Sequence, residues 1–316
     1  MPSFVAGPRE PKMLIGKNGR LAHPVAMMMR QARGKVPVDR VVDGLAAETD
    51  RALRAALAGR RVLIAYGLIG DLLAAMRRLG VDYMASQAGW LRDRILADPQ
   101  VVPLPTAAPV VDNAARLAIV LASDPRPAVV IAHSKGGLDT LAALMNPAAR
   151  ERCAAFIAIQ SPFYGSPIAD VLAAASPLRA TVTGSLRLLR AGSGLGLRDL
   201  TTAARQTWMR ENALQLAMLV EHIPLVCCAT AVSEATVGPD RRYLALARWM
   251  ERQGYGPNDG MVPVSSALLP GAQHVILGGG HRGTVSKGRG RDPIGRLRGL
   301  LKLALLETMP AQKRAG

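Results

Sequence analysis

Residues 128–140, with the sequence AVVIAHSKGGLDT, constrain the fold more than any other segment of this chain. The apolar run at 128–132 is typical of a buried parallel strand, and residues 137–146 predict the helix that follows it. Between them, AHSKG at 132–136 fits the small-x-Ser-x-Gly pattern of a nucleophile elbow, a sharp turn that lifts a serine off the end of a strand. The positions two residues before and after the serine lie close together in such a turn. Alanine and glycine satisfy the resulting need for small side chains.

The partners of Ser134 are expected downstream, because this turn is followed in chain order by an acid and then by a histidine. His222 and His274 each begin an apolar, strand-like run, which indicates structural roles. His281 follows a triple glycine at the end of the second of these runs. Catalytic groups of open parallel sheets collect beyond the carboxyl ends of the strands, so His281 is the predicted base. The side chain of His133, beside the serine, is expected to point elsewhere.

Asp259 is the predicted acid, and it lies in the segment GPNDGMVP at 256–263, shortly before His281. Asn, Asp and Gly are also ordinary turn formers, so the alternative is a turn with no catalytic role. The whole segment from this turn through the histidine, residues 256–284, favours the catalytic interpretation.

These segments together resemble bacterial α/β-hydrolase lipases and esterases. The AHSKG turn, the NDG-x-V-P-x-x-S-A segment and the late His-x-Gly carry the resemblance. VLIAYGLIG at 62–70 resembles the strand and turn that supply one oxyanion-hole amide. SPFYGS at 161–166 resembles the stretch after the strand that follows the elbow. The resemblance extends from about residue 60 to residue 286 and is specific for the superfamily, not for a substrate.

The resemblance implies an α/β-hydrolase fold, a mostly parallel sheet flanked by helices, with a helical cap or lid insertion. It implies a serine hydrolase that cleaves carboxylic esters through an acyl-enzyme, with Ser134 as nucleophile, His281 as base and Asp259 as the acid that orients it. The backbone amides of Leu68 and Lys135 are expected to bind the oxyanion, and the Lys135 side chain to add positive potential. No cofactor is expected.

Two segments depart from the family pattern. Tyr66 replaces the usual histidine before Gly67, and Phe163-Tyr164 replaces a His-x pair. The oxyanion donor is a backbone amide, so the first change leaves it in place. Residues 282–290 contain no Asp or Glu, so the calcium site of some related lipases is not expected.

Alternative functions remain open at this stage. A serine, an acid and a histidine in the same roles also serve polyhydroxyalkanoate depolymerases, thioesterases and acyltransferases. A noncatalytic hydrolase-fold binding protein is a further alternative. The physiological substrate, its acyl-chain length and alcohol group, and the oligomeric state do not follow from the sequence.

The sequence predicts an irregular N-terminal extension at 1–38, rich in Pro, Gly and Arg, and a hydrolase domain at 39–316. Within that domain the predicted strands are 61–66, 101–104, 128–132, 154–160, 223–229 and 274–279. The predicted helices are 39–58, 71–79, 85–97, 110–122, 137–146, 168–175, 177–190, 199–221, 240–253 and 293–308. The segment 166–221 stands where these enzymes carry a cap. Its apolar residues either line an acyl pocket or merely cover the sheet; they include Leu186, Leu188, Leu189, Leu195, Leu197, Trp208 and Met209.

The chain is strongly basic, with a net charge of +17. Such a balance favours contact with anionic surfaces such as phospholipid head groups or polymer granules. Its cations are spread along the chain, and no basic run is interleaved with aromatic residues, which make up 3%. Solvated helix faces therefore explain the charge better than specific nucleic-acid binding, and a lipid or small-molecule ester is the expected partner.

A cytoplasmic location is expected. The sequence has no run of roughly 20 apolar residues that would span a bilayer, and the N-terminus shows no signal-peptide core. Cys153, Cys227 and Cys228 give neither a disulfide framework nor metal-ligand spacing.

Overall fold

The computed structural model describes residues 38–68, 82–174 and 195–307, with side chains from residue 45 onward. The chain divides into two units, Met1–Ala46 and Ala47–Gly316, and helix α2 (Val38–Leu57) has residues in both. The larger unit contains the sheet. The helices predicted at 71–79 and 177–190, and the predicted extension up to residue 37, lie outside the described residues.

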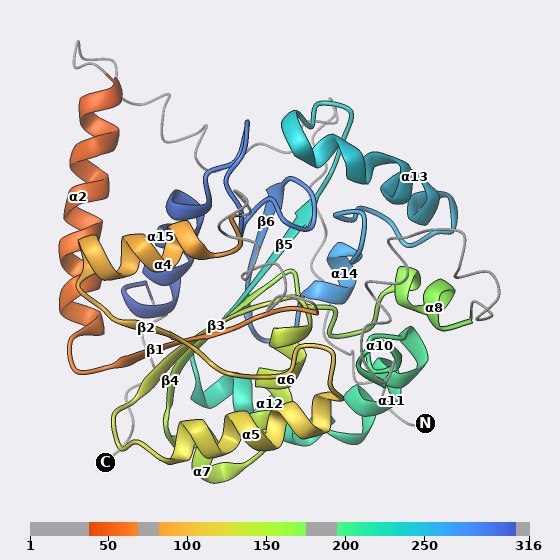
Figure 1. Ribbon diagram of the computed structural model, residues 1–316, viewed down its shortest axis with the longest axis horizontal. Coiled ribbons are helices and arrows are strands. Elements are labelled where there is room, and N and C mark those ends of the chain that lie inside the picture. Colours follow the sequence, from red (N-terminus) through yellow and green to blue (C-terminus); the bar gives the residue numbers. More distant parts are fainter. Residues whose placement is uncertain (1–37, 69–81, 175–194, 308–316) are drawn as a thin grey trace, which may run out of the picture. The chain divides into compact units, whose positions relative to one another are not determined.

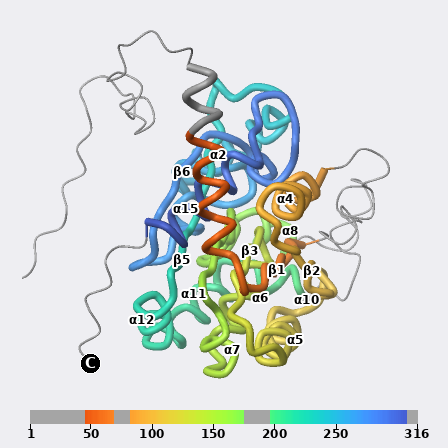
Figure 2. Tube along the Cα trace, turned by 90° about the vertical axis from the view of Figure 1, so that its left-hand side faces the viewer, coloured from red at the N-terminus to blue at the C-terminus, as the bar shows by residue number. Residues whose placement is uncertain are grey.

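The sheet has six strands in the order β2-β1-β3-β4-β5-β6, and every neighbouring pair is parallel (Figure 1). Its edge strands β2 and β6 lie on opposite sides in the turned view of Figure 2. Each strand begins within two residues of its predicted start. The strands are β1 (Arg61–Ala65), β2 (Pro99–Val101), β3 (Ala128–His133), β4 (Cys153–Ile159), β5 (Leu225–Ala231) and β6 (Gln273–Gly278).

The order of the strands creates a switch point between β1 and β3. Strand β2 pairs with one side of β1, and the chain then crosses to the other side, where β3 and all later strands follow. In open α/β sheets, ligands bind beyond the carboxyl ends of the strands at such a point. The loop after β1 and the turn after β3 therefore meet at the place where this fold builds a site.

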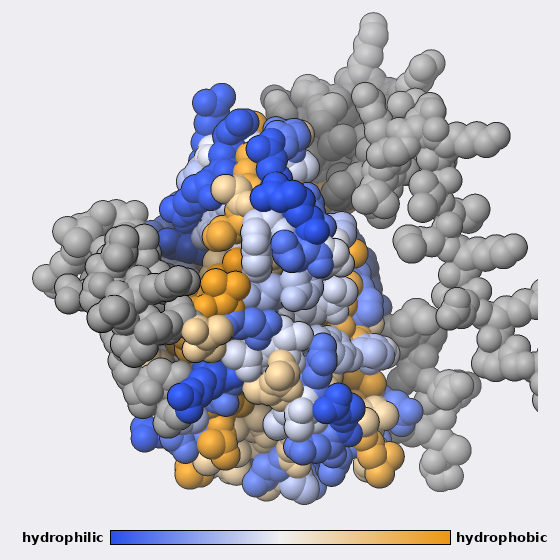
Figure 3. Space-filling model, turned by 90° about the vertical axis from the view of Figure 1, so that its right-hand side faces the viewer, coloured by the Kyte–Doolittle hydropathy of each residue, from blue (hydrophilic) through white to orange (hydrophobic). Residues whose placement is uncertain are grey.

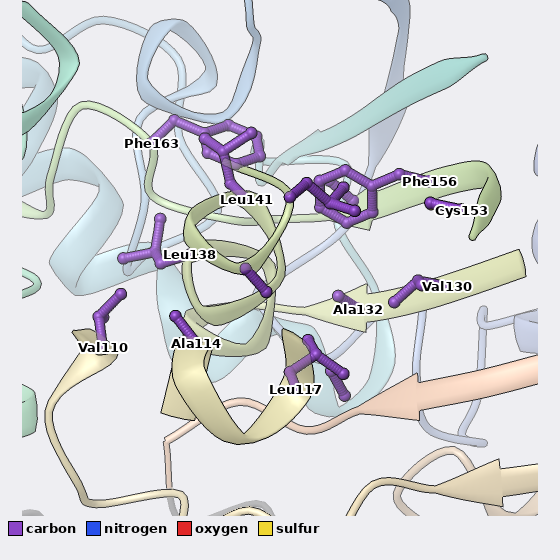
Figure 4. Packing of buried hydrophobic residues seen from close by; sticks show 14 of the residues in the cluster. Val110, Ala114, Leu117, Val130, Ala132, Leu138, Leu141, Cys153, Phe156 and Phe163 are labelled. Carbon is purple, nitrogen blue, oxygen red and sulfur yellow. The ribbon is translucent and has the colours of Figure 1, made fainter. Parts of the chain in front are cut away.

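Both faces of the central strands β1, β3, β4 and β5 are buried, whereas the edge strands β2 and β6 each have exposed residues. Successive residues of each strand alternate between the two faces. Val130 and Phe156 pack on one face against α5 (Val110–Ala122) and α6 (Lys135–Ala143). Figure 4 shows Leu138 and Leu141 of α6 directed into this cluster. The residues next to them along the strands, Val129 and Ile157 among others, pack on the opposite face. Two-sided burial is why these strands are continuous apolar runs.

The remaining helices cover the sheet or connect its strands (Figure 1). Helix α15 packs against α4, β4 and β5 on the face opposite α6. These helices are α4 (Ala85–Trp90) with a π-helical turn (Leu91–Ile95), α7 (Pro147–Glu151), α8 (Pro167–Ala174), α10 (Leu195–Arg198), α11 (Thr202–Glu211), α12 (Ala213–His222), a 3₁₀ turn (Gly238–Tyr243), α13 (Leu244–Arg252), α14 (Val264–Ala267) and α15 (Pro293–Leu305).

The single helix predicted at 199–221 is two helices in the structure. Asn212 separates α11 from α12, with φ of −106° and ψ of 14°. Its side-chain amide donates to the Trp208 carbonyl at 2.8 Å, and its backbone N–H donates to the same oxygen. An asparagine that bonds a neighbouring carbonyl competes with the helical ladder, which the apolar periodicity of the segment does not reveal.

Hydrophilic residues dominate the face shown in Figure 3, and hydrophobic residues interrupt them in small groups. Within the described part of the chain, no helix has the length and apolar character needed to cross a membrane. All three cysteines are buried free thiols, and burial raises the pKa of each to about 12.

Arg61 joins the start of β1 to the end of α5. It is 6% exposed, and its guanidinium donates to the carbonyls of Val120 and Leu121 at 2.8 Å and to those of Arg126 and Asp124 at 3.1 and 3.2 Å. The last carbonyls of a helix have no partner within the helix, so this side chain supplies their missing donors.

Replacement of Arg61 by methionine is expected to lower the free energy of unfolding by about 3 kcal/mol, because buried carbonyls lose their donors. Arg60→Met, at an exposed position, is the matched control and should change it by less than about 0.5 kcal/mol. Urea denaturation measures both. Equal losses in the two variants would contradict a stabilising role for the Arg61 hydrogen bonds.

Candidate active site

Ser134 stands between β3 and α6 in a backbone conformation that serine rarely adopts. Its φ is 54° and its ψ is −125°, which costs about 1–3 kcal/mol for a residue with a side chain. The backbone N–H of Ser134 donates to the Ile159 carbonyl of the adjoining strand at 2.9 Å. The structure thus contains the strand, sharp turn and helix that the sequence predicts at 128–140.

Close approach of the backbone explains the glycines around this serine. A Cβ atom on Gly136 would collide with the carbonyl groups of Ala65 and Tyr66 at the end of β1. A Cβ atom on Gly67 would stand 2.8 Å from the Cβ of Ser134. The elbow therefore needs glycine two residues after the serine, because α6 begins directly against the end of β1.

Ser134, His281 and Asp259 are brought together although they are far apart in the sequence. The distance from Ser134 Oγ to His281 Nε2 is 3.0 Å, and that from His281 Nδ1 to Asp259 Oδ2 is 2.8 Å. Asp259 is 1% exposed. When His281 is neutral, Asp259 accepts from Nδ1–H, and Nε2 is then free to accept from the serine hydroxyl.

The turn that carries Asp259 fixes the orientation of its carboxylate. The second oxygen, Oδ1, accepts the backbone N–H groups of Met261 and Val262, each at 2.8 Å. The backbone N–H of His281 also donates to the Asp259 carbonyl at 3.0 Å. Asn258 stabilises the turn from within, since its side chain accepts from the Gly260 N–H at 2.9 Å.

The two predicted oxyanion donors lie at the switch point. Leu68 follows β1 and lines the same pocket as Ser134, and Lys135 is the first residue of α6. A helix N-terminus presents free N–H groups and partial positive charge, so the Lys135 amide suits an oxygen that becomes negative.

The Lys135 side chain departs from expectation. Its ammonium group is fully buried and donates to both oxygens of Asp139, at 2.8 and 3.0 Å. Asn113 donates to the same carboxylate at 3.0 Å. Burial raises the pKa of Asp139 to about 6, although Lys135 opposes this. The charge of Lys135 is compensated inside the protein, so it adds little potential at Ser134.

His133 belongs to the site, contrary to the sequence-based expectation that its side chain points elsewhere. The Tyr83 hydroxyl accepts the Gly67 N–H at 2.9 Å and lies 2.8 Å from His133 Nδ1. His133 Nε2 lies 2.9 Å from the His281 carbonyl. A carbonyl only accepts, so Nε2 carries the proton and Nδ1 accepts from Tyr83. This chain of hydrogen bonds joins the loop after β1 to the backbone of His281.

The pKa of His133 is lowered to about 3. Burial is the main cause, and the charge of the neighbouring His281 is the second. The histidine is therefore neutral at ordinary pH. The position of His133 next to the serine was the available sequence signal, but its contacts come from 50 residues upstream and 148 residues downstream.

The other described histidines lie apart from the site. His274 Nε2 contacts the Leu269 carbonyl at 2.6 Å, and His222 Nδ1 contacts the Met218 carbonyl at 2.6 Å. Among the described residues, no group of three or more His, Cys, Asp or Glu side chains is placed to hold a metal ion.

A largely apolar pocket of about 160 Å³ opens beside the serine. A hollow of about 330 Å³ at the opposite end of β1, beside Arg60 and Arg61, has no serine, cysteine or histidine in its lining. The residues around the smaller pocket are Gly67, Leu68, Tyr83, His133, Ser134, Pro162, Ser166, Leu200, Tyr243, Met261, Val262, His281 and Arg282.

The predicted cap contributes little of this lining among the described residues. Ser166 and Leu200 reach the pocket, whereas Leu197 and Met209 are buried in the core beneath the sheet and Trp208 packs against it. The side chains of residues 186, 188, 189 and 195 lie outside the described ones. The SPFYGS segment at 161–166 differs from the family pattern at Phe163 and Tyr164. Phe163 has a structural role, since its side chain is fully buried.

Solved structures resemble this chain in their fold. The Bacillus licheniformis lipase BlEst2 in its mature form has a TM-score of 0.55 and 21% identity, covering 70% of this chain and 84% of that chain. The metagenomic carboxyl esterase MGS0156 has a TM-score of 0.55 and 18% identity, covering 90% and 95%. This chain has the α/β-hydrolase fold. At these identities the likeness establishes the fold. Neither protein-family models nor curated protein sequences gave a match.

Within this α/β-hydrolase fold, His133 is expected to make stability depend on pH. Its folded pKa lies below the ordinary 6.5, so between about pH 6.5 and pH 3 the unfolded chain binds a proton that the folded protein does not. The free energy of unfolding should then fall as pH falls, by up to about 1.4 kcal/mol per pH unit.

His133→Gln should reduce this slope, whereas His222→Gln, at an exposed position, should retain it. Urea denaturation from about pH 7 to about pH 4 measures the difference. Asp139 titrates in both variants, so its contribution cancels. An unchanged slope in His133→Gln would show that the buried histidine is not the titrating group.

Proposed function

We propose that this protein is a serine hydrolase that cleaves carboxylic esters through an acyl-enzyme. The observation that carries the proposal is the continuous hydrogen-bond path from Ser134 Oγ through His281 to Asp259. Its setting supports the same conclusion, since the serine sits in a strained elbow at the switch point of an α/β-hydrolase fold. Similar solved structures include a lipase and a carboxyl esterase.

In the proposed reaction, Ser134 Oγ attacks the ester carbonyl carbon while His281 Nε2 takes the hydroxyl proton. Asp259 stabilises the imidazolium through the hydrogen bond from Nδ1. The negative oxygen of the tetrahedral intermediate faces the amides of Leu68 and Lys135. The carbon–oxygen bond to the alcohol then breaks, and the alcohol leaves with the proton from His281. Water repeats the sequence on the acyl-enzyme and releases the acid.

Labelling by a fluorophosphonate tests this proposal without knowledge of the substrate, because the reagent reacts with an activated serine. The wild-type protein should be labelled and Ser134→Ala should not, with an unchanged melting curve. Absence of labelling in the wild type would favour a noncatalytic hydrolase-fold binding protein. Labelling of Ser134→Ala at another serine would place the nucleophile elsewhere.

The base and the acid can be tested by their rates on a short ester. His281→Ala should be nearly inactive, and Asp259→Asn should lose a factor on the order of 10⁴ in kcat, as in serine proteases with the same three residues. His274→Ala is the matched control and should retain most activity. A dead His274→Ala together with an active His281→Ala would overturn the assignment.

The acyl site is proposed to be the apolar pocket beside Ser134, with Leu200 from the cap segment in its wall. Leu200→Ala should shift preference toward longer acyl chains by about ten-fold in relative kcat/KM, since a methylene group in an apolar pocket is worth about 1–3 kcal/mol. Leu214→Ala, at a position 74% exposed, should leave it unchanged. A folded Leu200→Ala with the wild-type preference would place the acyl site elsewhere.

A further inference from the structure

Arg282 places a positive charge in the wall of the proposed catalytic pocket. It follows His281 directly and lines the pocket together with Ser134, Tyr83 and Tyr243. The side chain is partly buried. Apart from it, the pocket lining is made of apolar, hydroxyl and imidazole groups, so this guanidinium is the charge that a substrate would meet.

This guanidinium has no carboxylate partner among the described residues. Its Nη2 donates to the Ser286 hydroxyl at 3.2 Å, and its centre lies 6.0 Å from the Tyr83 ring. Its Nε is buried without a hydrogen-bond partner. By contrast, Arg298 and Arg291, which are also partly buried, pair with Asp50 and Asp240, respectively.

The charged side chains that act on Arg282 most strongly are two further arginines. Burial lowers the pKa of Arg282, and the neighbouring Arg242 and Arg291 lower it further, whereas the two pocket tyrosines raise it. Arg291 is occupied by Asp240. A desolvated charge without a counterion is costly, and an anion that enters the pocket would remove this cost and gain charge-assisted hydrogen bonds.

We infer that Arg282 binds an anionic group of the substrate, a carboxylate or a phosphate, carried a few bonds from the scissile ester. This inference rests on the proposed ester hydrolysis at Ser134 and names its substrate class. The pocket holds both residues within about 160 Å³, so the anion and the reacting carbonyl must be close. The guanidinium forms two parallel hydrogen bonds to either kind of anion. It takes no part in bond making or breaking.

Two pairs of matched esters test the inference. On the acyl side, p-nitrophenyl hemisuccinate carries a carboxylate that p-nitrophenyl butyrate lacks. On the alcohol side, monobutyryl-glycerol phosphate is compared with monobutyrin. The wild type should favour the anionic member of at least one pair by about ten-fold or more in kcat/KM, the range of a hydrogen bond to a charged group. The preferred pair identifies the side of the ester that carries the anion, and the binding measurement with succinate and phosphate below identifies the kind of anion.

The anionic-to-neutral ratio should fall about ten-fold or more in Arg282→Gln and recover in part in Arg282→Lys, which keeps the charge. Arg289→Gln, at an exposed position, is the matched control and should keep the wild-type ratio. Equal ratios in the wild type and Arg282→Gln for both pairs would overturn the inference.

A binding measurement separates this inference from the proposed function. Calorimetry of the Ser134→Ala protein with succinate and with inorganic phosphate, at low ionic strength, should detect binding of one anion that Arg282→Gln in the same background loses. Such binding, together with a wild-type protein that hydrolyses no ester and takes no fluorophosphonate label, would refute the hydrolase proposal and retain the anion site. Ester hydrolysis without any anion binding or anion preference would do the reverse.

Discussion

The contact between the start of α6 and the end of β1 is the constraint on which the rest of the site depends. Gly136 has no room for a Cβ atom beside the carbonyls of Ala65 and Tyr66. That contact holds Ser134 in its strained conformation, which the hydroxyl needs in order to project beyond the sheet. It also sets the N-terminus of α6 beside the loop after β1, the two segments that carry the predicted oxyanion donors Lys135 and Leu68. The packing energy of central strands buried on both faces maintains this arrangement.

Hydrogen bonds then connect loops that the sheet alone leaves independent. Asp259 holds His281 through its side chain and its carbonyl, and His133 holds the His281 carbonyl from the other side. Tyr83 continues this path to the loop after β1. Every member has a partner of the correct donor or acceptor type, which is the condition for a buried polar network to stabilise a structure. Arg282 differs, since its Nε is buried without a hydrogen-bond partner. This difference supports the inference that Arg282 binds an anionic ligand.

Much of the fold followed from the sequence because parallel strands buried on both faces are continuous apolar runs. Each of the six strands overlaps the run that predicts it, although β2 shares only Val101 with its predicted run at 101–104. The predictions are less accurate where a polar side chain or a change of helix type intervenes. Asn212 divides one expected helix, the segment predicted as a helix at 85–97 includes a π-helical turn, and a 3₁₀ turn precedes α13. The boundaries and function of the predicted cap remain predictions.

The sequence by itself determined the elbow, the order serine–acid–histidine and the acidic turn, since each depends on local backbone geometry or on chain order. Only the tertiary structure decided what those residues contact. It directed the Lys135 charge into an internal pair with Asp139, brought His133 into the site, and left Arg282 without a carboxylate partner among the described residues. These outcomes depend on side chains far apart in the sequence, whose distances are set by how the strands cross and pack, and no local pattern records them.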